Sequence, residues 1–308
     1  MKKYIFLFLS FLYLEASCGL QLSSEKPKVI VTFSILGDFV YQIAGDSVDL
    51  ETLVGPNGDA HVYEPTPEDA KNIMAADIII MNGLGFEGWL PRLLKATKTK
   101  AKIVSVTDGI CSLQTEEESD APDPHAWHNM KNAMLYGEAI LAALIEISPQ
   151  SKEKFSYNWA IMKKKLEKLD REFKARIASI PRHCRKVITL HDGFQYLGKA
   201  YGIEFLTPLG ISTEAEPSAK DLVGIIKEAK NHSIQVVFLE NISNPRVMEQ
   251  VAKESGAKVG DTLFSDALSE KEGPASTFEK MMQHNFSVFL KAFQEACKNH
   301  DLILLQEA

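Results

Sequence analysis

Residues Pro149–Ile180 read PQSKEKFSYNWAIMKKKLEKLDREFKARIASI, and this stretch decides the architecture of the chain. Apolar side chains recur at helical spacing from Phe155 to Phe173, with Lys, Arg and Glu between them. Proline is tolerated in the first turn of a helix and Pro181 ends one, so the pattern predicts one helix over 149–180, roughly 45 Å long. A coiled-coil seam is the alternative, but the stretch has too few clean heptads.

On both sides of this helix, short apolar strands alternate with amphipathic helices. Strands are expected over Val29–Phe33, Asp49–Val54, Asp77–Met81 and Lys102–Val106, and again over Val187–Leu190, Glu204–Thr207, Gln235–Leu239 and Ala257–Val259. Such alternation is typical of α/β proteins with parallel sheets. We therefore predict two α/β lobes with parallel sheets, over 27–148 and 185–308, joined by one long rigid helix over 149–180. A flexible hinge would contain Gly and Ser instead of Lys and Leu.

Composition and charge exclude several classes of protein. The chain has 308 residues with 34 basic and 41 acidic side chains, and its formal charge is −7. This length fits two lobes or one large domain. Nucleic-acid binding needs clustered Lys and Arg, so the acidic balance argues against it. No interior stretch approaches the ~18 apolar residues of a membrane-spanning helix, which excludes a multi-pass transporter.

The N-terminus has the layout of a secretory signal peptide. Lys2 and Lys3 precede an apolar run over 5–14, and small residues follow, so residues 1–17 are expected to be removed by cleavage near Cys18. Ala16-Ser17-Cys18 resembles a bacterial lipobox, although Glu15 stands where Leu is expected. The alternative is ordinary cleavage near Ser17. We predict a periplasmic protein, either soluble or attached to the membrane only through a lipid on Cys18.

The remaining cysteines are Cys111, Cys184 and Cys297. None of them forms a CxxC pair, so zinc-ribbon and thioredoxin-like sites are excluded. An oxidising compartment allows one disulfide among them, but their spacing does not select the partners.

Four histidines and one aspartate lie where α/β proteins place ligands. They follow predicted strands or lie in the loops beyond them, where open sheets bind ligands, and they are His61, His125, His128, His191 and Asp266. Imidazole nitrogens with a carboxylate oxygen suit Zn²⁺, and Mn²⁺ or Fe²⁺ with lower preference. No HExxH motif is present, and a lone histidine at a strand end is more often structural.

Five segments together give a more specific indication. They are Gly58–Pro65 (GDAHVYEP), Asp123–Trp127 (DPHAW), Thr189–Phe194 (TLHDGF), Glu214–Ala219 (EAEPSA) and Leu263–Leu268 (LFSDAL). In this order, and over nearly the whole mature chain, they resemble the metal-binding solute-binding proteins of zinc and manganese ABC importers.

The resemblance implies a metal site in the cleft between two lobes, with His61 and His125 from the first lobe and His191 and Asp266 from the second. It implies a monomer without enzymatic activity that carries one divalent ion to the membrane permease of an ABC importer. Zinc-dedicated members often have a His-rich acidic loop before the second ligand, whereas Thr115–Asp120 is short and lacks His. Manganese-dedicated members often have Glu in place of His191. Three imidazoles and a carboxylate favour Zn, and Mn and Fe stay open.

The main alternative is a secreted metal-dependent hydrolase. Such a site keeps one coordination position open for water and needs a carboxylate as general base, for which Glu64 and Asp123 are the nearby candidates. Asp59 and Glu64 are also expected to hydrogen-bond around His61. His128 is expected to be a solvated residue at a helix start. A third possibility, an adhesin, has no sequence feature of its own.

Overall fold

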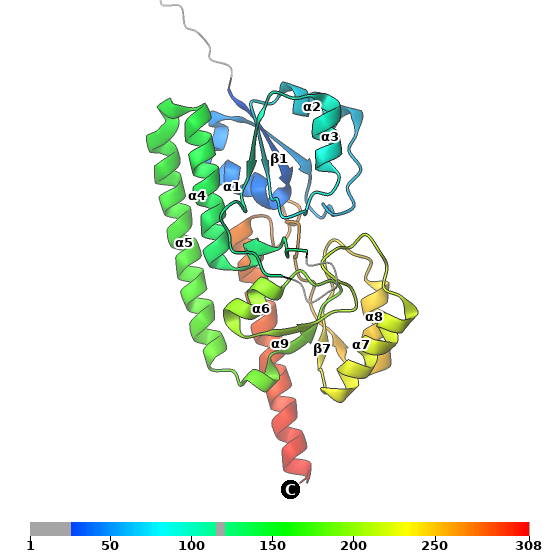
Figure 1. Cartoon of the computed structure of the whole chain (residues 1–308). Coiled ribbons are helices and arrows are strands. Elements are labelled where there is room, and N and C mark those ends of the chain that lie inside the picture. The colour runs from blue at the N-terminus through cyan, green and yellow to red at the C-terminus, as the bar shows by residue number, and fades with distance from the viewer. Residues whose placement is uncertain (1–25, 115–120, 308) are drawn as a thin grey trace, which may run out of the picture.

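The chain folds into two lobes, each built on a four-stranded parallel sheet (Figure 1). The structure is a computed structural model that describes residues 26–114 and 121–307. Both sheets have the same strand order, in which the second strand of the lobe lies at one edge and the first, third and fourth follow in turn. The predicted signal peptide over 1–17, Cys18 and the acidic stretch Thr115–Asp120 lie outside the described residues.

The N lobe follows the predicted pattern closely. Its elements are β1 (Lys28–Phe33), α1 (Ser34–Ala44), β2 (Asp49–Val54), α2 (Pro67–Ala75), β3 (Ile78–Met81), α3 (Leu90–Thr97), β4 (Lys102–Ser105) and α4 (Met130–Ile147). The strand ends agree with the sequence prediction to within one residue. β1 lies between β2 and β3, and Val29 is paired with both Leu50 and Ile78. Helix α2 begins with a capping box in which Thr66 and Asp69 bond each other's backbone N–H groups.

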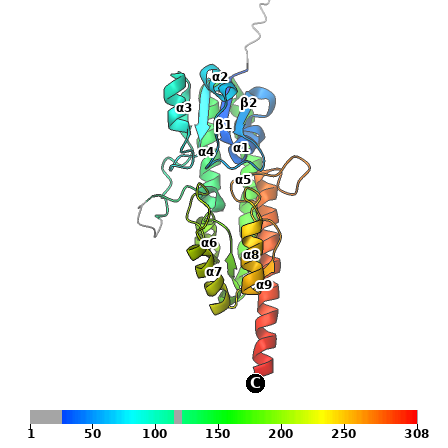
Figure 2. The ribbon, with the colours of Figure 1, turned by 90° about the vertical axis from the view of Figure 1, so that its right-hand side faces the viewer.

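The C lobe repeats this arrangement with shorter strands. Its elements are β5 (Lys186–Ile188), α6 (Gln195–Tyr201), β6 (Glu204–Leu206), α7 (Ala219–Asn231), β7 (Val236–Val237), α8 (Arg246–Ser255), β8 (Lys258–Val259) and α9 (Phe278–Glu307). β5 ends two residues before the predicted Leu190. Beyond it, the N–H groups of Leu190 and His191 bond to the carboxylate of Glu240 instead of a neighbouring strand. The last turns of α9 extend past the lobe (Figure 2).

Helix α5 (Lys152–Ala178) has 27 residues, or roughly 40 Å, and runs beside both lobes (Figure 1). The predicted long helix is confirmed, but Pro149 lies in a separate 3₁₀ turn, Pro149–Ser151, before it. Another 3₁₀ turn, Arg182–Cys184, leads into β5. α5 packs closely on α4 because Gly137 leaves room for Trp159: a Cβ at Gly137 would lie 2.1 Å from the Trp159 ring.

One apolar core joins the two lobes. It extends from Phe39 of α1 through Trp159 and Phe173 of α5 to Phe289 of α9. In its centre, the rings of Phe173 and Phe286 stack with their centroids 3.7 Å apart. The outer face of each sheet has a separate core, under α2 and α3 in the N lobe and under α7 and α8 in the C lobe. Because α5 and α9 are buried against both lobes, they connect the two lobes through this shared core.

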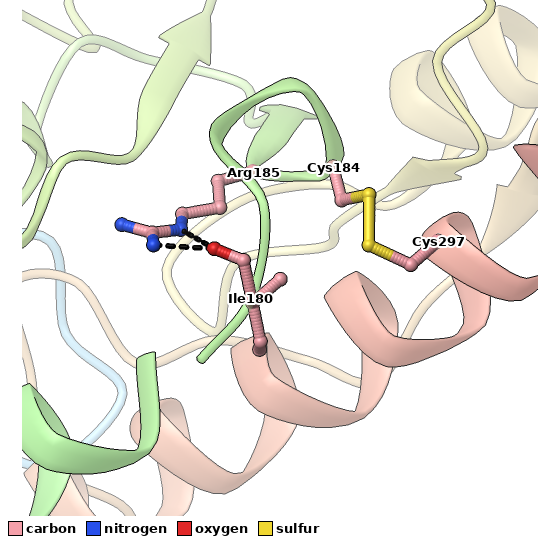
Figure 3. Close-up of a disulfide and its surroundings, with 4 residues drawn as sticks. All are labelled: Ile180, Cys184, Arg185 and Cys297. Carbon is pink, nitrogen blue, oxygen red and sulfur yellow. Dashed lines mark hydrogen bonds between the residues drawn. A yellow bond between two sulfur atoms is a disulfide. The ribbon is translucent and has the colours of Figure 1, made fainter. Parts of the chain in front are cut away.

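A disulfide closes the far end of the C lobe. Cys184, directly before β5, is bonded to Cys297 of α9 (Figure 3). The neighbouring Arg185 donates a hydrogen bond from Nε to the carbonyl oxygen of Ile180 at 2.9 Å, which fixes the turn between α5 and β5. Cys111 is a free, exposed thiol. The structure thus selects one of the pairings that the sequence left open.

Within residues 26–114 and 121–307, no helix is both long and apolar enough to cross a bilayer.

The disulfide is expected to stabilise the C lobe, because it closes a loop with a sequence separation of 113. Replacing Cys184 and Cys297 by Ser should lower the free energy of unfolding by about 2–5 kcal/mol in urea denaturation. The control is Cys111→Ser, which removes a free thiol and should leave the midpoint unchanged. Equal midpoints for both variants would contradict the stabilising role.

Candidate metal centre

The structure brings together the four side chains that the sequence singles out. His61 follows β2, His125 precedes the 3₁₀ turn Ala126–His128, His191 follows β5, and Asp266 lies between β8 and α9. One donor atom from each side chain lies within 4.8 Å of the other three. The N lobe contributes two imidazoles, and the C lobe contributes one imidazole and the carboxylate.

The spacing of these atoms matches one small coordination shell. Nε2 of His125 lies 3.2 Å from Nε2 of His61 and 3.4 Å from Nε2 of His191. Oδ2 of Asp266 lies 3.3 Å from Nε2 of both His61 and His191. A tetrahedral shell with bonds of ~2.0–2.1 Å has edges of roughly 3.3–3.4 Å. Nε2 of His125 and Oδ1 of Asp266 are 3.7 Å apart, which is longer than such an edge. The four side chains therefore surround a space of the size that one metal ion needs.

The four side chains of this cluster are buried. His125, His191 and Asp266 are fully buried, and His61 is 8% exposed. Neither oxygen of Asp266 receives a hydrogen bond from the described part of the chain. A buried carboxylate without hydrogen bonds is costly unless positive charge lies beside it. The free oxygens of Asp266 and the converging imidazole nitrogens fit a bound cation.

Two further carboxylates orient the imidazoles. Nδ1 of His125 donates to Oδ1 of Asp123 at 2.8 Å, and Nδ1 of His191 donates to Oε2 of Glu240 at 2.6 Å. Each bond leaves Nε2 with its lone pair facing the centre, as metal-binding histidines require. Asp123 was predicted from the sequence only as a candidate base, and Glu240 was not predicted. Glu240 directly follows the predicted strand over 235–239, and this position was the signal that could have identified it.

The charges of the centre are strongly coupled. Burial lowers the pKa of His125, but the carboxylates of Asp266 and Asp123 outweigh burial and raise this pKa to about 9. Burial is likewise outweighed at His191, where Glu240 and Asp266 raise the pKa well above its ordinary value. Burial alone would raise the pKa of Asp266, whereas the imidazoles hold it well below its ordinary range. The centre is built to hold positive charge, and protons compete with a metal for the same nitrogens.

Aromatic rings enclose the N-lobe side of the centre. The ring of Phe86 meets the imidazole of His61 edge-on at a centroid distance of 4.7 Å, and Trp127 lies 5.3 Å from His125. Trp127 and Phe194 are fully buried, and Phe86 is nearly so. These rings keep water away from the imidazoles.

His128 corrects one prediction. It is not a solvated residue but is fully buried, with its ring 4.6 Å from that of Phe194. Burial lowers the pKa of His128 to about 3, so the imidazole is neutral near neutral pH. His128 ends the short 3₁₀ turn Ala126–His128, all of whose residues are buried.

The residues beside His61 have different surroundings. Oδ1 of Asp59 accepts a hydrogen bond from the backbone N–H of His61 at 2.9 Å, so it holds the main chain and not the imidazole ring. Glu64 is exposed. Asp123, the other candidate base for a hydrolase, contacts the Nδ1 edge of His125, which faces away from the centre. Neither Glu64 nor Asp123 is therefore placed to activate a water bound to a metal at the centre.

Gly193 leaves open the space in which the donors converge. A Cβ at this position would lie 2.5 Å from Nε2 of His191 and 2.8 Å from its Cε1. Any side chain here would displace the imidazole or occupy the place of the ion.

Comparisons with known proteins identify the family of the chain. The family model described as zinc-uptake complex component A, periplasmic, matches residues 29–292. The iron ABC transporter substrate-binding lipoprotein MtsA of Streptococcus pyogenes serotype M1 is 36% identical over 270 residues, which cover 85% of this chain and 87% of MtsA. The manganese ABC transporter substrate-binding lipoprotein PsaA of Streptococcus pneumoniae is 32% identical over 271 residues, which cover 85% of this chain and 87% of PsaA. The periplasmic zinc-binding protein TroA of Treponema pallidum superimposes with a TM-score of 0.83 at 28% identity, covering 87% of this chain and 99% of TroA.

Gly193→Ala should abolish high-affinity zinc binding while the fold is retained, because the added methyl group collides with His191. Zinc titration by calorimetry, with circular dichroism to check the fold, measures both effects. The matched control is Gly224→Ala in α7, where a Cβ meets no atom within 4 Å and zinc binding should be unchanged. Wild-type affinity in the Gly193→Ala protein would show that the ion does not lie at this point.

Proposed function

The chain belongs to the family of periplasmic zinc-uptake complex component A proteins, and we propose that it carries zinc, bound by His61, His125, His191 and Asp266. The chain is an extracytoplasmic solute-binding protein, not an enzyme, and it delivers a divalent metal ion to the permease of an ABC transporter. Its site takes the ion as cargo. Since all four proposed ligands come from one chain, we propose that it acts as a monomer.

The choice of zinc rests on the ligand set and its spacing. MtsA and PsaA are named for iron and manganese, and TroA for zinc, so family membership leaves the metal open. Three imidazole nitrogens and one carboxylate oxygen, separated by 3.2–3.4 Å along the four edges given above, suit a tetrahedral Zn²⁺ ion. Manganese prefers more oxygen ligands and a larger shell.

The arrangement of the ligands also indicates how the ion is released. The N lobe supplies His61 and His125, and the C lobe supplies His191 and Asp266, so a small separation of the loops divides the shell into two incomplete halves. Each half alone has two donors and holds zinc weakly. A permease that draws these loops apart therefore receives the ion without any chemical step.

Protein purified from its native host before chelation should contain one zinc per chain by elemental analysis. His61→Ala should lower zinc affinity by on the order of 100-fold or more, because it removes one of four ligands. His232→Ala, at an exposed histidine paired with Glu228, is the control and should bind normally. Manganese or iron in the purified protein would contradict the choice of metal, and tight one-to-one binding by His61→Ala would contradict the assigned ligands.

We further propose that a lipid on Cys18 anchors the mature protein to the membrane. Ala16-Ser17 before Cys18 supports this, and MtsA and PsaA are both named lipoproteins. Acyl chains on one cysteine bury enough methylene groups in a bilayer to hold a folded domain at its surface.

Cys18→Ser should move the protein from the membrane fraction to the soluble extracytoplasmic fraction and leave zinc affinity unchanged. Cell fractionation with metabolic labelling by a radioactive fatty acid measures the change, and Cys111→Ser should keep both the label and the membrane location. An unlabelled wild-type protein in the soluble fraction would contradict the anchor.

A further inference from the structure

The loop Ile211–Pro217 of the C lobe reaches across to the N lobe beside the metal centre. Its first end is fixed next to a proposed ligand, because the N–H of Asp192 donates to the carbonyl oxygen of Gly210 at 3.0 Å. Its other end is fixed by Ser218, which caps α7 in a capping box with Asp221. Between these two anchors, the loop is partly or fully exposed.

This loop contacts the N lobe through Thr213 and Glu214. Oγ1 of Thr213 donates a hydrogen bond of 2.6 Å to Oδ2 of Asp59. The other oxygen of the same carboxylate, Oδ1, accepts the backbone N–H of His61 at 2.9 Å. Oε1 of Glu214 lies 3.9 Å from the position of a Cβ at Gly88. Asp59 thus connects the loop of one lobe directly to a proposed ligand of the other.

The contact lies at the edge from which the centre can be reached. His61 has 8% of its surface exposed, whereas His125, His191 and Asp266 are fully buried. The next residue, Val62, is 47% exposed. His61 is therefore the proposed ligand nearest to solvent, and it lies on the side where Asp59 and Thr213 join the lobes.

We propose that the hydrogen bond between Thr213 and Asp59 is the latch of a gate formed by the loop Ile211–Pro217, and that it sets the rate at which the metal enters and leaves. This inference rests on the proposed function of the four ligands. The bond joins two protein groups and does not touch the ion. Without this bond, the loop opens more easily, so the metal both enters and leaves faster. The four proposed ligands stay in place. Asp59 and Thr213 are positioning residues.

The test compares Thr213→Val with Thr213→Ser, which differ in the hydroxyl group. Thr213→Val keeps the size of the side chain and loses the donor, whereas Thr213→Ser keeps the donor. Zinc release into excess chelator and zinc uptake are followed by stopped-flow fluorescence. Both rates should rise about tenfold in Thr213→Val, as expected for one hydrogen bond to a charged acceptor, with Kd changed less than about threefold. Thr213→Ser should keep wild-type rates.

A second variant separates the latch from the positioning of His61. Asp59→Ala removes both hydrogen bonds of this carboxylate, so exchange should be faster and Kd should also weaken, by about tenfold. Wild-type rates in Thr213→Val, or equally fast exchange in Thr213→Ser, would overturn the gate while the proposed function stands. Failure of the wild-type protein to take up zinc would overturn the proposed function, and the gate with it.

Discussion

Asp266 is a fully buried carboxylate that receives no hydrogen bond from the described residues, and it faces three imidazole nitrogens. Such a group is unfavourable in a protein interior unless a cation lies beside it. Asp123 and Glu240 each add a buried negative charge behind an imidazole, which further favours positive charge at the centre. Each carboxylate also orients the imidazole that it bonds, so that Nε2 faces the centre. The fold must therefore bring two lobes together around one point of positive charge and keep water away from it.

The scaffold combines a rigid core, formed by two long helices, with loops that can move at the cleft. Helices α5 and α9 are buried against both lobes in one apolar core, and the disulfide between Cys184 and Cys297 ties α9 to the start of β5. Each lobe, by contrast, supplies its proposed ligands from loops that follow the strands. A shared core resists large hinge rotations, so loop movements at the cleft suit capture and release better than a wide opening of the whole molecule.

Much of this account could be predicted from the sequence because it depends on local patterns. The strands of the N lobe, the long helix and the positions of His61 and Asp266 follow from apolar periodicity and from the motifs around each residue. The rest depends on which segments meet in space. The burial of His128 depends on a 3₁₀ turn, and the pairing of Cys184 on the docking of α9. The contact between the loop Ile211–Pro217 and the N lobe joins residues over 150 positions apart, and no local pattern indicates it.

X-ray absorption spectroscopy at the zinc edge, on protein loaded with one equivalent of zinc, reports the ligand shell of the ion. We expect four light-atom ligands at ~2.0–2.1 Å, with the multiple-scattering pattern of three imidazoles, and loss of one imidazole contribution in His125→Ala. A shell that contains sulfur, one with fewer than three imidazoles, or an unchanged spectrum in His125→Ala would contradict the proposed zinc site.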